Sequence, residues 1–138
     1  MYSLLLKTQF LSCLFMVGVI WTIQLVHYPS FHFVASENFV SFEKFHAFRI
    51  SLVVIPAMLI ELLTAAALVY FFKENSQLLM INFILVLCIW AVTFFISSPA
   101  HGKLLSGFST ETINFLISTN WIRTILWTAK AALIFYIL

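Results

Sequence analysis

Four apolar stretches, each close to the length that crosses a bilayer, constrain the fold of this chain more than any other feature. They cover about residues 8–27, 46–72, 78–97 and 120–138, and a transmembrane helix needs about 20 residues. The first stretch has no small-residue cleavage site, so we interpret it as a helix rather than as a signal peptide. The sequence therefore predicts an all-α fold, an antiparallel four-helix transmembrane bundle that forms a single domain over residues 1–138.

The composition agrees with a protein whose surroundings are membrane lipids. Hydrophobic residues make up 63% of the 138 residues and charged residues 9%, whereas soluble domains have about 25% charged residues. The sequence has no basic patch, which excludes nucleic acid as a partner. Cys13 and Cys88 each stand alone, without a CxxC or CxxCH motif, and this argues against thiol–disulfide chemistry and against covalently attached haem.

The connections between the stretches differ in length. Residues 73–76 form a short polar turn, while 29–45 and 100–119 are each expected to hold a short helix in the membrane interface. Ser36 is typical of a helix start, and so are Ser109 and Thr110. The segments around Pro29 and Pro99 are expected to end the first and third transmembrane helices.

Positive charges indicate an orientation in the membrane. Four basic residues lie near the two longer connections and two lie near the termini. Since cytoplasmic loops carry an excess of Lys and Arg, the 1–2 and 3–4 connections are predicted to be cytoplasmic. The expected location is a bacterial inner membrane. The sequence leaves open a homo-oligomer or membership of a larger membrane complex.

The histidines are the strongest indication of a site. His27 ends the first stretch, His46 begins the second and His101 follows the third, so antiparallel helices would bring all three to one membrane face. Imidazole is the commonest ligand of transition metals in proteins. These three residues are the predicted ligands of a transition-metal ion or a non-covalent haem. The alternative is that histidines simply favour membrane interfaces, and His32 is interpreted as a residue of a solvated loop.

Further polar residues fall at the same depth as the histidines. Arg49 and Arg123 are expected to hold a polar or anionic group of a substrate, although either could instead extend to lipid phosphates. Gln24 and Asn120 are expected to orient that substrate by hydrogen bonds, and Trp127 to contact it.

Two charges lie deeper, near the middle of the apolar core. From the helical rise, Glu61 is ~18 Å inward from Arg49, and Lys130 is ~15 Å inward from Asn120. An isolated charge at that depth costs about 3 kcal/mol, so the sequence predicts a Glu61–Lys130 ion pair across the bundle. The pair could fix the helix register, or it could form part of a proton or substrate relay.

Several of these segments together resemble a known group of proteins. They are Gln24–Pro29, Phe45–Arg49, Pro56 with Glu61, and Asn120–Lys130. Over nearly the whole chain they resemble a family of small bacterial four-helix membrane proteins of unknown function. The layout is also similar to that of anthrone-oxygenase-like proteins. The resemblance implies oxidative chemistry on an aromatic or polycyclic substrate in the bilayer.

The leading hypothesis from the sequence is an integral membrane oxidoreductase with a histidine-lined metal or haem site at one membrane face. Its substrate would be a lipophilic small molecule, aromatic or quinone-like. The alternative is a non-enzymatic protein, either a small membrane carrier or an accessory subunit of a larger membrane complex. Apolar surfaces on all four helices suit either a carrier or a subunit.

Overall fold

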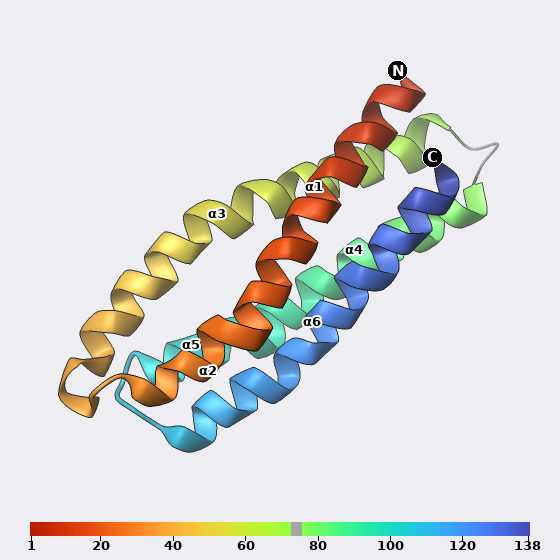
Figure 1. The fold of residues 1–138 in the computed structure, drawn as a ribbon. Coiled ribbons are helices and arrows are strands. Elements are labelled where there is room, and N and C mark those ends of the chain that lie inside the picture. Colours follow the sequence, from red (N-terminus) through yellow and green to blue (C-terminus); the bar gives the residue numbers. More distant parts are fainter. Residues whose placement is uncertain (73–75) are drawn as a thin grey trace.

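A computed structural model describes residues 1–72 and 76–138, and this part of the chain folds into four long helical segments (Figure 1). In order they are α1 (Tyr2–Thr22) continued by η1 (Ile23–His27), α2 (Tyr28–Ser30) and η2 (Phe31–Phe33); α3 (Ser36–Phe71); α4 (Ser76–Val92) continued by η4 (Thr93–Ser97) and α5 (Ser98–Leu104); and α6 (Thr110–Ile137). The polar turn that the sequence predicts at residues 73–76 falls mainly on 73–75, which lie outside the described residues.

Three of the segments are long and apolar enough to cross a membrane: Tyr2–Phe33, Ser36–Phe71 and Gln77–Leu104. Large apolar side chains are exposed along the outside, for example Leu63, Phe95 and Phe135. Several polar residues of α6 are instead buried: Asn120, Arg123, Thr124 and Lys130. Apolar surfaces outside and polar groups inside fit an integral membrane protein.

The arrangement of the helices brings distant parts of the sequence together. α1 packs against α3 and α6, and α4 packs against the same two helices. Both termini lie at one end of the molecule, together with the end of α3 and the start of α4 (Figure 1). The other end holds α2, α5 and the first turns of α3 and α6, and the residues with site-forming chemistry gather there.

The prolines do not end the first and third helical segments, in contrast to the prediction. The chain stays helical through Pro29 and Pro99, and a π-helical turn, η1 or η4, directly precedes each of these two sites. In these turns the N–H of Tyr28 bonds to the carbonyl of Ile23 five residues earlier, and the N–H of Ser98 does the same with Thr93. The wider π-helical turn accommodates the proline ring, which in a regular α-helix would clash with the carbonyl four residues earlier.

The predicted interfacial helices are not separate elements before the second and fourth spans. α3 begins at Ser36 rather than near residue 46, and α6 begins at Thr110 rather than near residue 120. The hydroxyl oxygen of Ser109 accepts a hydrogen bond from the N–H of Thr112 and caps α6. Because both helices are longer than predicted, each reaches past the site and can contribute residues from its first turns.

A separate apolar cluster supports this end of the molecule. Its largest members are Tyr28, Phe31 and Phe39, which pack with Leu104, Ile113 and Leu116. The cluster joins residues from α2, η2, α3, α5 and α6, so it fixes these short elements relative to one another.

Candidate metal centre and adjoining cavities

Glu43, His46 and His101 form the closest group of metal-ligating side chains in the described part of the chain. One ligand atom from each residue lies within 4.8 Å of the other two. Glu43 and His46 are three residues apart on α3 and therefore share one side of the helix. α5 brings His101 to the same side, because the chain stays helical beyond the η4 turn.

The group holds buried polar atoms without partners. His101 Nδ1 lies 2.5 Å from Glu43 Oε1, but Glu43 Oε2 and His46 Nε2 are buried and form no hydrogen bond. Glu43 itself is 0% exposed. Since nearly all buried polar atoms in proteins are paired, a free carboxylate oxygen and a free imidazole nitrogen in one place make this group a candidate ligand site.

Neighbouring residues hold the second nitrogen of each imidazole. His27 Nε2 lies 2.7 Å from His46 Nδ1, and the hydroxyl of Tyr28 lies 3.0 Å from His101 Nε2. His27 is the last residue of the π-helical turn η1, and Tyr28 is the first residue of α2. Histidines that bind a metal almost always use the other ring nitrogen in such a hydrogen bond, which fixes the orientation of the ring.

The types of ligand in this group, two imidazoles and one carboxylate, occur together in known kinds of metal site. Two imidazoles and one carboxylate form catalytic zinc sites and non-haem ferrous sites, and in both the ion keeps positions open for water or substrate. The Glu43–His46 spacing is also the Glu-x-x-His spacing by which helix bundles bind metals. The geometry therefore suits a single ion with open coordination positions.

The predicted histidines do gather at one end, but they do not all belong to the same close group. The rings of His46 and His101 are 5.3 Å apart between centroids, and those of His27 and His46 are 4.5 Å apart. His27 lies beside His46, outside the Glu43–His46–His101 group. Sequence reasoning did not include Glu43 among the candidate ligands, although its spacing from His46 was the available signal.

His32 is not part of this group. Its side chain is exposed, and its Nε2 lies 3.0 Å from Asn114 Oδ1. This placement agrees with the interpretation of His32 as a surface residue.

A first cavity of about 710 Å³ reaches the centre between α1 and α3. His27, His46 and Arg49 line it on the polar side. The rest of the wall is apolar and includes three aromatic rings, those of Phe15, Phe42 and Phe45. The side chain of Arg49 is exposed and lies over the ring of Phe45, with 5.4 Å between its Cζ and the ring centroid.

A second cavity of about 460 Å³ reaches the centre from another side. Its wall includes Tyr28 and His101 at the metal centre, Arg123 from α6 and Ser97 from η4. The remaining wall comes mainly from apolar residues of α3, α4 and η4. Both cavities thus extend from the candidate centre into apolar surroundings, which is typical of sites for lipophilic ligands.

Two of the predicted substrate-binding residues position a third. Asn120 donates a hydrogen bond of 2.9 Å to Gln24, and Gln24 donates one of 3.1 Å to the carbonyl of Ile117. Asn120 Oδ1 in turn accepts a bond of 3.3 Å from Arg123. Gln24 and Asn120 therefore link α6 to the first helical segment and orient Arg123.

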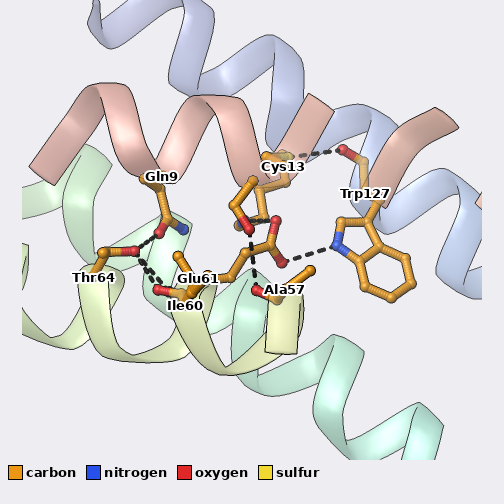
Figure 2. Close-up of polar contacts among 9 residues, drawn as sticks. Gln9, Cys13, Ala57, Ile60, Glu61, Thr64 and Trp127 are labelled. Carbon is orange, nitrogen blue, oxygen red and sulfur yellow. Dashed lines mark hydrogen bonds and ion pairs between the residues drawn. The ribbon is translucent and has the colours of Figure 1, made fainter. Parts of the chain in front are cut away.

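Trp127 lies deeper, in a second buried polar cluster (Figure 2). Its indole N–H donates to Glu61 Oε2 over 3.0 Å. Glu61 Oε1 lies 2.9 Å from Lys130 Nζ, so the structure contains the ion pair expected from the sequence, with both side chains buried. Gln9 and Thr64 bond to each other beside the pair (Figure 2), and neither of the two cavities includes Trp127 in its wall.

Comparison with protein-family models, with curated proteins and with solved structures finds no match to this chain. The resemblance to four-helix bacterial membrane proteins and to anthrone-oxygenase-like proteins stays a prediction.

Proposed function

We propose that this chain is an integral membrane oxidoreductase that holds one transition-metal ion with Glu43, His46 and His101. The four long helices would cross the bilayer in alternating directions, with the metal centre near one membrane face. A bacterial inner membrane with the 1–2 and 3–4 connections in the cytoplasm is the location we expect. The substrate would be a lipophilic, aromatic or quinone-like molecule that enters from the bilayer.

The observation that carries this proposal is the pair of unpartnered buried atoms within the group. Glu43 Oε2 and His46 Nε2 have no hydrogen bond, while the outer nitrogens of His46 and His101 are held by His27 and Tyr28. A cluster with a purely structural role would pair its inner atoms first, because an unmade buried hydrogen bond costs about 1–3 kcal/mol. Here the outer nitrogens are held, while His46 Nε2 and Glu43 Oε2 are left without a partner and His101 Nδ1 bonds to Glu43 Oε1 within the group.

The arrangement favours a single ion over a haem. The donors of three residues converge within 4.8 Å, and His101 and Glu43 are in direct contact. A haem-binding imidazole faces a flat open space instead. We therefore propose an ion rather than the haem that the sequence left as an alternative.

Redox chemistry is favoured over hydrolysis by the surroundings of the centre. The first cavity is lined by Phe15, Phe42 and Phe45 next to two histidines, a setting that suits a flat aromatic ring and holds few groups that could position water. A ferrous ion with two imidazole ligands and one carboxylate is the centre of many oxygenases. When bound, such an ion would supply the electron transfer, and the phenylalanines would orient the ring of the substrate.

The test uses purified protein in lipid nanodiscs, stripped with a chelator and then loaded without oxygen with ferrous ion or with zinc. We expect about one ion per chain in the wild type and at least about tenfold weaker binding in Glu43→Gln and His46→Ala. His32→Ala is the matched control, because it removes an exposed histidine outside the group. The ferrous protein should then consume oxygen when a short-chain quinol is added, and the zinc protein should not, since zinc has no redox chemistry.

The outcomes separate the parts of the proposal. If the ferrous protein consumes no more oxygen than the zinc protein, the metal centre stands and the oxidoreductase assignment fails. If neither ion binds, or if Glu43→Gln and His46→Ala bind as the wild type does, the centre itself is refuted. In that case the carrier or accessory-subunit hypothesis becomes the leading one.

A further inference from the structure

The side chain of Arg123 is buried without an acidic partner in the described part of the chain. It is only 4% exposed, and the two ion pairs found among residues 1–72 and 76–138 are His101–Glu43 and Lys130–Glu61. A guanidinium group stays charged in proteins, and a charge inside a membrane-spanning bundle is expensive unless another group offsets it. The ring of Trp127, 5.3 Å from Arg123 Cζ, supplies only a partial offset.

The hydrogen bonds found for Arg123 in the described part of the chain leave one edge of the guanidinium unused. Both hydrogen bonds of Arg123 in the described structure come from Nη1, which donates to Ser97 over 3.4 Å and to Asn120 over 3.3 Å. Nε is buried and unpartnered. Nη2 donates no hydrogen bond in the described structure either, although the hydroxyl of Tyr28 interacts with the guanidinium. The Nε and Nη2 edge has two parallel N–H groups, which match the two oxygens of a carboxylate.

Arg123 lines the second cavity, and the wall of that cavity indicates the rest of the ligand. Val54, Met58 and Trp90 give it an apolar interior. Ile55 and Phe94, also in its wall, are 48% and 60% exposed on the outside of the bundle. The cavity wall between α3 and the α4–η4 segment is therefore mainly apolar toward the surface that would face lipid, with the hydroxyls of Ser51 and Thr93 among its polar groups.

We propose that this second cavity binds a single-chain lipophilic carboxylate, such as a fatty acid. Its carboxylate would pair with the Nε and Nη2 edge of Arg123, and its chain would run between α3 and α4 toward the bilayer. Charge complementarity selects this occupant, because a neutral lipid or a quinone would leave the guanidinium unbalanced. The inference goes beyond the proposed function and does not depend on a metal ion at Glu43, His46 and His101.

The experiment measures binding of radiolabelled hexadecanoate to the whole protein in nanodiscs, with empty nanodiscs as the baseline. Hexadecanol, which has the chain without the charge, and acetate, which has the charge without the chain, serve as competitors. We expect hexadecanoate to compete at least about tenfold better than either. Arg123→Gln should abolish the preference for the acid over the alcohol, whereas Lys44→Gln, which removes an exposed positive charge at the same end of the bundle, should leave it unchanged.

A second variant keeps the test decisive if Arg123→Gln fails to fold. Arg123→Lys retains the charge but loses the planar pair of donors, so it should still bind hexadecanoate, several-fold more weakly than the wild type. Equal binding of hexadecanoate and hexadecanol, or of hexadecanoate and acetate, would overturn the proposal. An unchanged preference in both Arg123 variants would overturn it as well. The metal content of the same samples is measured separately, so a failure here is distinguishable from a failure of the metal centre.

Discussion

The buried Glu61–Lys130 pair allows a quantitative prediction for the interior of the bundle. Lys130 Nζ lies 2.9 Å from Glu61 Oε1, and the side chains are 0% and 2% exposed. We consider Lys130→Met, Glu61→Gln and the double variant. Each single change removes one charge and leaves the other buried, while the double change removes both charges and keeps the shapes of the side chains.

The magnitudes follow from what each variant leaves behind. Breaking a buried pair by removing one partner costs about 3–5 kcal/mol, while replacing both partners is often neutral or stabilising. In Lys130→Met the carboxylate still accepts the hydrogen bond from Trp127 Nε1, so we place this variant near the lower end of that range. The double variant should cost about 1 kcal/mol or less, so the two single effects should be strongly non-additive.

The assay is unfolding of the detergent-solubilised protein by sodium dodecyl sulfate, followed by circular dichroism, for the wild type and all three variants. Leu63→Ala is the control, because Leu63 lies on α3 near Glu61 and its side chain is exposed. Single variants that each cost less than about 1 kcal/mol, or a double variant whose cost equals their sum, would refute the reasoning.

Three further variants test the parts that surround the centre. His27→Ala should weaken metal binding by about 10- to 100-fold without abolishing it, because His27 only holds the outer nitrogen of His46; a wild-type affinity in a metal titration would contradict this. Ser109→Ala should lower the free energy of unfolding by about 1 kcal/mol through loss of the α6 cap, and no change in the detergent titration would count against it. Gln24→Leu should cost about 1–3 kcal/mol in the same titration because it leaves Asn120 without its acceptor, and an unchanged stability would show that water replaces Gln24.

The broad layout of the fold could be predicted because it depends on the number and length of the apolar stretches and on the turns that connect them. Four apolar stretches predicted four helical segments, and counting the turns between them placed His27, His46 and His101 at one end. The π-helical turns before Tyr28 and Ser98 could not be predicted in this way. They depend on a shift of hydrogen bonds from the fourth to the fifth preceding residue, which leaves no mark in the hydrophobic pattern.

The same turns explain why the candidate site differs from the predicted one. Because proline was expected to end a helix, Tyr28 and His101 were placed outside the predicted helices. The orientation of their side chains could then not be derived. The sequence likewise predicted a short interfacial helix within residues 29–45 and a transmembrane helix from about residue 46, so Glu43 and His46 were not assigned to one continuous helix. Once α3 is known to begin at Ser36, the two residues share a face, and Glu43 becomes a natural ligand.

The most direct test of the metal centre compares Glu43→Gln with His27→Ala at saturating ferrous ion, by metal analysis of the purified chains. Glu43 belongs to the group that could hold an ion, and in our proposal His27 only supports His46 from beside it. We therefore expect Glu43→Gln to lose most of its iron while His27→Ala retains about one ion per chain. The reverse pattern, with iron retained in Glu43→Gln and lost in His27→Ala, would contradict the account.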